Sequence, residues 1–287
     1  MTEHADVSNP RLYREDAWAP HFERLRREDP VHRHAESPYG PYWSVTRFAD
    51  IMKVELDPGT YSSASELGGI QIATHAIGDQ GNHDVAAWYE EALRSLPKSE
   101  WKLADPRWRI EHAQILRPAD YHYFNDLPII ASMQPSHAIG DLHFAAARLG
   151  DARLDGAYAW KSLTDRDVIV VGGSDAPVER GDPLIEFYAA VARRDLNGFQ
   201  GPDWRPQEAV SRETALKMFT LWPAYASFRE DELGTIEVGK RADFTAFSVD
   251  LMTAPAADIL NGLALYTIVD GVVVHRATAP MQVSPAI

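Results

Sequence analysis

Four residues with metal-binding or proton-transferring side chains recur along the later part of this chain: His75, His112, His137 and Asp175. They follow the short apolar stretches IQIAT, WRIE, LPIIASMQPS and DVIVVGGS. Two neutral imidazoles and one carboxylate form a ligand set for zinc or a similar divalent ion, and the carboxylate can also accept a proton. We therefore predict that His75, His112 and Asp175 bind a metal, and that Asp175 and His137 act in catalysis.

The spacing of these residues supports a shared site. His75 and His112 are about one strand-and-helix unit apart, and His112 and Asp175 are about two such units apart. A single histidine is more often a packed core or loop residue than a ligand. Here three strand ends agree, so a common site is the favoured interpretation.

Another histidine pair, His32 and His34, has the spacing by which one strand can point two imidazoles to the same side of a sheet. The preceding residues, RLRREDP, are charged rather than apolar. Because a strand that carries a metal usually follows a buried apolar stretch, the favoured interpretation is two surface histidines, with a metal pair as the alternative.

The chain contains no cysteine among its 287 residues, and it contains eleven histidines. Disulfides, thiolate zinc sites, cysteine nucleophiles and thiolate-ligated haem are therefore excluded. The predicted cofactor is a divalent metal, with zinc as the first candidate, and no haem.

Charge and hydropathy limit the possible partners. The net charge of -14 comes from acids spread along the chain, without a block of basic residues, which argues against nucleic acid and anionic membranes as partners. No stretch is apolar enough for a membrane span, and MTEHADVSNP lacks the profile of a signal peptide. We expect a cytoplasmic location and a small-molecule substrate.

The elements that must position the four residues alternate between strands and helices. Helical spacing of Val85, Trp88, Tyr89, Ala92 and Leu96 follows the first strand. In a parallel β/α barrel the C-terminal strand ends surround the catalytic face, so polar residues at these ends predict a site there.

The chain's last part shows a different pattern. RADFTAFSV and YTIVDGVVVHR alternate like strands, and Asp270 and Gly271 predict a hairpin turn between two of them. Before these strands, Ser211 has the position of a helix N-cap.

The motifs THAIGD, RIEHAQIL, IASMQPSHAIGD, GGSDAPVE and GTIEVGKRADFTAFSVDL resemble the C-terminal two-thirds of the amidohydrolase superfamily, in the branch of N-substituted formamide deformylases. The resemblance covers residues of about 71 to 280. It implies metal-dependent hydrolysis of a C–N bond in an amide-like substrate. It also implies that His75 and His112 are the ligands of the fifth and sixth barrel strands and Asp175 the ligand and proton shuttle of the eighth.

Residues of about 8 to 70 resemble a different family. The patterns LRREDPVHR, YWSVTRFADI and YSS are similar to the N-terminal segment of bacterial cytochromes P450 of the alkane and fatty-acid hydroxylase type. A P450 reaction needs a cysteine thiolate, which this chain lacks. The segment therefore carries a resemblance without a catalytic residue, and the chain has the features of a chimera.

The combined prediction is an α/β fold with three parts. A short α+β P450-like segment (1–70) precedes an incomplete, half TIM-type β/α barrel (71–233) and a C-terminal β-sandwich portion (234–287). Barrel strands one to four, with the first-strand histidine pair and fourth-strand lysine or glutamate that the superfamily resemblance implies, are not recognised in the sequence. A half barrel should expose its edges and its apolar interior.

Three functional interpretations follow. The chain is a metal-dependent amidohydrolase completed by homo-oligomerisation through its barrel edges, a catalytically inactive fusion, or a scaffold that binds other molecules.

Overall fold

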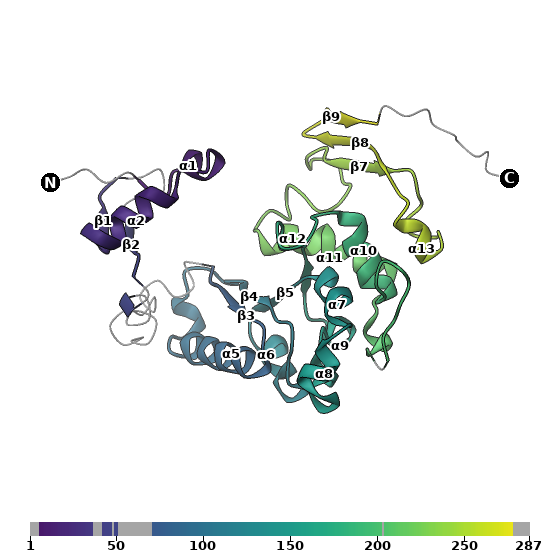
Figure 1. Cartoon of the computed structure of the whole chain (residues 1–287), viewed down its shortest axis with the longest axis horizontal. Helices are drawn as coiled ribbons and strands as arrows, with labels where there is room; N and C mark the ends of the chain where they lie inside the picture. Colours follow the sequence, from purple (N-terminus) through teal and green to yellow (C-terminus); the bar gives the residue numbers. More distant parts are fainter. Residues whose placement is uncertain (1–5, 37–41, 48, 51–70, 203, 278–287) are drawn as a thin grey trace. The chain divides into compact units, whose positions relative to one another are not determined.

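The chain folds as two compact units, Met1–Ser65 and Glu66–Ile287, in a computed structural model (Figure 1). The structure describes residues 6–36, 42–47, 49–50, 71–202 and 204–277. No helix within these ranges is long and apolar enough to cross a membrane.

The first unit combines short helices with a small antiparallel sheet. Its elements are α1 (Pro10–Arg14), α2 (Ala19–Glu28), β1 (Val31–His34) and β2 (Tyr42–Val45). A short α+β segment was predicted for this part of the chain, and the helices and strands found here agree with an α+β composition. Residues 51–70 of the predicted segment lie outside the described residues.

A parallel four-stranded sheet forms the centre of the second unit, with its strands side by side in chain order. The strands are β3 (Ala73–Ala76), β4 (Trp108–His112), β5 (Ile129–Met133) and β6 (Val170–Gly172). The four predicted strands are thereby confirmed. No fifth strand joins this sheet within the described ranges, and its closure into half of a barrel remains a prediction.

Helices follow each strand of the sheet. They are α5 (Asp79–Arg94), α6 (Tyr121–Asp126), α7 (Pro135–Asp141), α8 (Ala145–Leu149), α9 (Trp160–Thr164), α10 (Pro183–Ala192), α11 (Arg212–Phe219) and α12 (Leu221–Ala226). Short 3-10 turns lie at Lys98–Glu100, Pro118–Asp120, Asp151–Gly156 and Pro206–Glu208. The predicted N-cap is confirmed, because the Ser211 side chain accepts a hydrogen bond from the backbone N–H of Thr214.

One face of the sheet forms the core with α5. Trp108 and Ile110 of β4 are almost completely buried on this face. The Tyr89 hydroxyl of α5 donates to Thr74 Oγ1 at 2.6 Å, and its ring lies 4.9 Å from that of Trp108. Trp88, which was predicted to share the apolar stripe, is 62% exposed, because the buried stripe of α5 runs along its neighbours instead.

The opposite face of the sheet is more polar than a barrel interior was expected to be. In the strand register His75 pairs with Glu111, and Glu111 with Ser132. The apolar side chains Ile130 and Val171 on this face are buried in a cluster with Ala226 of α12. The expected exposure of apolar side chains is therefore not seen at Ile130 and Val171, which pack against α12.

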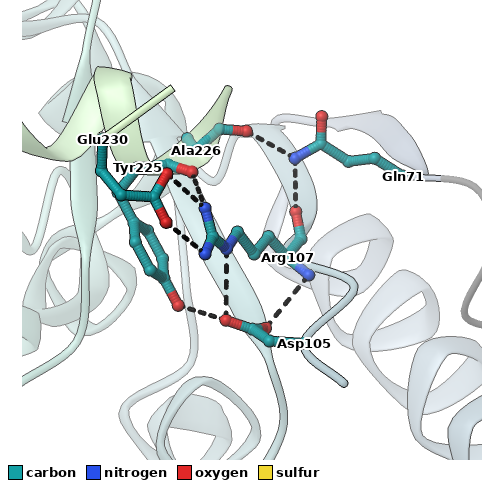
Figure 2. Close-up of polar contacts among 6 residues, drawn as sticks. All are labelled: Gln71, Asp105, Arg107, Tyr225, Ala226 and Glu230. Carbon is teal, nitrogen blue, oxygen red and sulfur yellow. Dashed lines mark hydrogen bonds and ion pairs between the residues drawn. The ribbon is translucent and has the colours of Figure 1, made fainter. Parts of the chain in front are cut away.

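Arg107 links the N-terminal end of the sheet to α12 by contacts with Tyr225 and with Glu230 (Figure 2). Its guanidinium forms two hydrogen bonds with Glu230, at 2.5 and 2.9 Å, and lies 3.7 Å from the centre of the Tyr225 ring. The Gln71 amide, just before β3, donates to the carbonyl of Ala226 at 2.7 Å. This network joins segments that are more than a hundred residues apart in the chain and lies at the opposite end of the strands from His112.

The C-terminal part forms a separate antiparallel sheet of β7 (Phe244–Phe247), β8 (Ala264–Val269) and β9 (Val272–Arg276), with α13 (Ala256–Ile259) between its first two strands. The predicted hairpin is confirmed: Asp270 and Gly271 adopt φ values of 51° and 78°, as a tight turn between twisted strands requires. No second sheet packs against it in the part of the chain that the structure describes.

Candidate functional site

His75 and His112 meet at the C-terminal edge of the parallel sheet. Their rings lie 4.5 Å apart between centroids, at an angle of 75°. β3 and β4 are adjacent parallel strands; His112 is the last residue of β4, and His75, which pairs with Glu111, is the last but one of β3. His75 is exposed, whereas His112 is only 8% exposed. The structure thus brings together two of the three predicted ligands.

The backbone at His112 departs from strand geometry. His112 has φ 75° and the next residue, Ala113, has φ 42°, both in the left-handed region that residues with a Cβ rarely adopt. Unusual backbone of this kind is concentrated at functional sites, where the surrounding structure must hold it in place. Strand β4 ends at His112, and the backbone turns away from the sheet at this residue and the next.

His112 has a hydrogen-bond partner in Gln134. Its Nδ1 lies 2.8 Å from Oε1 of that amide. Gln134 directly follows β5 and is the N-cap residue of α7. Gln134 belongs to the stretch LPIIASMQPS, but no role could be predicted for it, since nothing in the sequence shows which neighbouring side chain its amide faces.

His137 lies in the first turn of α7 rather than at a strand end. Its ring stacks on that of His112 at a centroid distance of 5.8 Å and an interplanar angle of 18°. Its Nε2 atom is buried and has no hydrogen-bond partner among the described residues, although Glu179 Oε1 lies 4.0 Å away. Burial lowers the pKa of His137, while the Glu179 carboxylate acts in the opposite direction. At pH 7 the imidazole of His137, which lies beside His112, is therefore neutral.

Asp175 lies in the loop after β6, with a φ of 54° and an exposed side chain. Its carboxylate is among the charges that raise the pKa of His137 and so partly offset the effect of burial. Within the described ranges, however, no group of three or more His, Asp or Glu side chains is arranged to hold a metal ion. The ligand set of His75, His112 and Asp175 therefore stays a prediction. Imidazole and carboxylate groups suit a divalent ion, and the two imidazoles, of His75 and His112, lie next to each other.

A buried carboxylate on α10 is hydrogen-bonded to the first turn of α7. Glu186 of α10 is 3% exposed and accepts the backbone N–H of Ser136 at 2.9 Å. Burial raises the pKa of Glu186 to about 7. A pocket of about 150 Å³ lies between α7 and α10, and its lining includes Ser136, Glu179 and Glu186. Neither glutamate was predicted from the sequence, because neither ends a strand nor belongs to a metal-ligand spacing.

The other histidine pair belongs to the first unit and packs there. The rings of His32 and His34 lie 4.5 Å apart. His34 is 5% exposed, stacks on Tyr42 at 4.3 Å and has its Nε2 2.9 Å from Ser44 Oγ. The interpretation as two surface histidines is therefore wrong for His34, which is buried against Tyr42 of the neighbouring strand.

A segment of this chain resembles an oxygenase. Over 70 residues, which are 24% of the chain, it is 43% identical to linalool 8-monooxygenase of Pseudomonas putida, and the match covers 17% of that protein.

Solved structures share the fold of the chain. An uncharacterized metal-dependent hydrolase from Pyrococcus horikoshii superposes with a TM-score of 0.52 and 23% identity, over 75% of this chain and 39% of that one. A mutant of atrazine chlorohydrolase from Arthrobacter aurescens, complexed with zinc and atraton, gives a TM-score of 0.50 at 19% identity, over 94% of this chain and 57% of that one. At these identities the likeness concerns the fold alone.

Sequence relatives extend the comparison. Protein LONG AFTER FAR-RED 3 of Arabidopsis thaliana is 33% identical over 74% of this chain, and N-substituted formamide deformylase of Arthrobacter pascens is 32% identical over 75%. The chain spans 37% and 38% of the lengths of these two proteins. The sequence profile described as "Amidohydrolase family" matches residues 63–275. The chain belongs to the amidohydrolase family.

Proposed function

We propose that this chain is part of a metal-dependent hydrolase that cleaves a C–N bond, other than a peptide bond, in a small amide-like substrate. The observation that carries the proposal is the contact between the His75 and His112 rings at the C-terminal edge of the parallel sheet. The deformylase relative, whose name states an action on N-substituted formamides, supports this substrate class.

The residues around this contact could divide the work of hydrolysis between metal binding and proton transfer. Bound at His75 and His112, a divalent ion, with zinc as first candidate, would supply a Lewis acid to polarise the substrate carbonyl. The exposed carboxylate of Asp175 can accept a proton from the attacking water, and the imidazole of His137, neutral at first, can take up a proton and pass it to the leaving amine.

Two converging imidazoles are fewer than the three protein ligands of a catalytic zinc site. We propose that a second copy of the chain, paired at the edge of β3, supplies the remaining donors. Within the described part of the sheet β3 pairs only with β4, and its residues Ala73 and His75 are exposed. Such an edge offers unpaired backbone groups to another strand.

Metal content and hydrolysis test this function together. We expect purified protein incubated with zinc to retain it after desalting, to release amine from N-substituted formamides, and to elute larger than a monomer. His112→Ala should lose both zinc and activity, whereas His275→Ala, on the exposed strand β9, should keep them. Wild-type protein that neither retains a divalent metal nor hydrolyses any formamide would contradict the proposal.

A catalytically inactive fusion is the alternative. It is favoured by the monooxygenase-like segment and by the division into units at Ser65 and Glu66. The 287 residues contain no cysteine that could ligate haem in a monooxygenase. Limited proteolysis tests the alternative: a fusion of independent pieces should be cut first between residues of about 64 and 74, and a full-length resistant chain would argue against it.

A further inference from the structure

The contact between Gln134 and His112 is short and shielded from water. The distance between Gln134 Oε1 and His112 Nδ1 is 2.8 Å, and the two residues are 7% and 8% exposed. A hydrogen bond in such surroundings is costly to lose, because the group left behind has no water to replace its partner.

The orientation of the amide decides which atom donates. Gln134 Nε2 lies 3.4 Å from the carbonyl oxygen of Ser132, so the amide directs its N–H groups to that acceptor. Turning the amide around would place its oxygen against the Ser132 carbonyl. The amide oxygen therefore faces His112, and an acceptor at that position requires the ring proton to be on Nδ1.

The ring of His112 is held on two further sides. His137 stacks on its face at 5.8 Å, and His75 meets it edge to face at 4.5 Å. Within the described chain no hydrogen bond reaches His112 Nε2. With the proton on Nδ1, this second nitrogen carries the free lone pair.

We infer that Gln134 is a positioning residue, which holds His112 in the tautomer with the proton on Nδ1 and the lone pair of Nε2 available as a ligand. The tautomer itself does not depend on the proposed function, whereas its use in binding a metal rests on that function. A donor held in this way raises the affinity of a metal site, because the ligand needs no reorientation before it binds.

Nitrogen NMR of metal-free protein with ¹⁵N-labelled histidine tests the inference directly. At a pH at which the histidines are neutral, two-bond proton–nitrogen spectra distinguish the protonated ring nitrogen, and His112→Asn identifies the His112 signals. We expect a protonated Nδ1 in the wild-type protein. Gln134→Met, which keeps the length of the side chain but removes the acceptor, should shift His112 toward protonation at Nε2.

Two variants sharpen this test. Gln134→Glu retains an acceptor oxygen and should keep the proton on Nδ1, which also serves if Gln134→Met fails to fold. Gln114→Met is the matched control: Gln114 is another amide after β4, 8% exposed, but it donates to Asp141 and should leave the tautomer unchanged. Wild-type or Gln134→Glu protein protonated at Nε2, or a Gln134→Met spectrum like that of the wild type, would overturn the inference.

Zinc affinity is the second measurement. If His112 is a ligand, Gln134→Met should weaken zinc binding roughly 10- to 100-fold, as losses of such supporting hydrogen bonds do, and Gln114→Met should not. Absence of zinc binding in the wild type would count against the proposed function, while the tautomer measured without metal would still decide the role of Gln134.

Discussion

Glu186 and Ser136 join two helices beneath the candidate site through one buried hydrogen bond. The carboxylate of Glu186 accepts the backbone N–H of Ser136 at 2.9 Å, one residue before His137. The bond satisfies an N–H at the start of α7, where helix geometry leaves such groups without a partner in the helix. The first turn of α7, and with it the imidazole of His137, is thereby tied to α10.

The burial of Glu186 should make stability depend on pH. Its pKa in the folded protein is about 7, raised from 4.5, so the folded state binds the proton more tightly than the unfolded state. The contribution of protonated Glu186 to the free energy of unfolding is full below pH 4.5 and is lost as pH rises to about 7. From pH 4.5 to 7, the free energy of unfolding of the wild type should fall relative to that of Glu186→Gln by on the order of 3 kcal/mol.

Urea denaturation at several pH values measures this difference. Glu91→Gln, an exposed glutamate of α5, is the control and should follow the wild-type profile. A Glu186→Gln profile parallel to the wild type over this range would show that Glu186 is not shielded in solution.

Arg107 should be important for stability rather than for the site. Arg107→Ala removes the pair with Glu230 and the packing on Tyr225, and it leaves a partly buried carboxylate without its partner. We expect a loss of about 2 to 4 kcal/mol in the free energy of unfolding. Arg94→Ala breaks a pair with Glu90 on the surface, where the arginine is 70% exposed, and should cost less than about 0.5 kcal/mol. Equal effects of the two variants would contradict the structure.

His137 should titrate below an ordinary histidine. Burial disfavours its charged form and lowers its pKa below 6.5, while Glu179 partly offsets this. Glu179→Gln removes the opposing charge and should lower the pKa of His137 further. Proton NMR of the His137 ring over pH 4 to 8 checks both statements, and an upward shift in the variant would show that Glu179 does not face the imidazole in solution.

The N-cap at Ser211 should be worth a measurable part of the stability of the second unit. Ser211→Ala leaves the N–H of Thr214 without its acceptor, and we expect a loss of about 1 kcal/mol. Ser211→Asp supplies another acceptor and should restore most of this loss. Thermal unfolding followed by circular dichroism distinguishes the two variants, and identical midpoints would exclude a capping role.

Local patterns in the sequence were sufficient for the elements themselves. The four parallel strands, the hairpin at Asp270 and Gly271, and the helix that begins after Ser211 were all predicted. Each depends on interactions between near neighbours in the chain: alternation in a strand, positive φ in a tight turn, and a side-chain cap for a free N–H. The placement of His75 and His112 on adjacent strand ends followed from the same reasoning.

Long-range contacts decided the rest. Helical spacing could not show that Trp88 faces solvent while Tyr89 packs on the sheet, because this depends on how α5 is rotated against β3 and β4. It also could not show that α12 covers Ile130, since the two lie far apart in the chain.

The site shows the same division between sequence and tertiary structure. Residue types predicted that His112 could bind a metal, but the amide that faces its Nδ1 comes from the residue after the next strand, and the ring on its face comes from α7. Strand periodicity specifies the side of a sheet on which a residue lies. The orientation of an imidazole is set by hydrogen bonds and packing across elements, which only the tertiary structure determines.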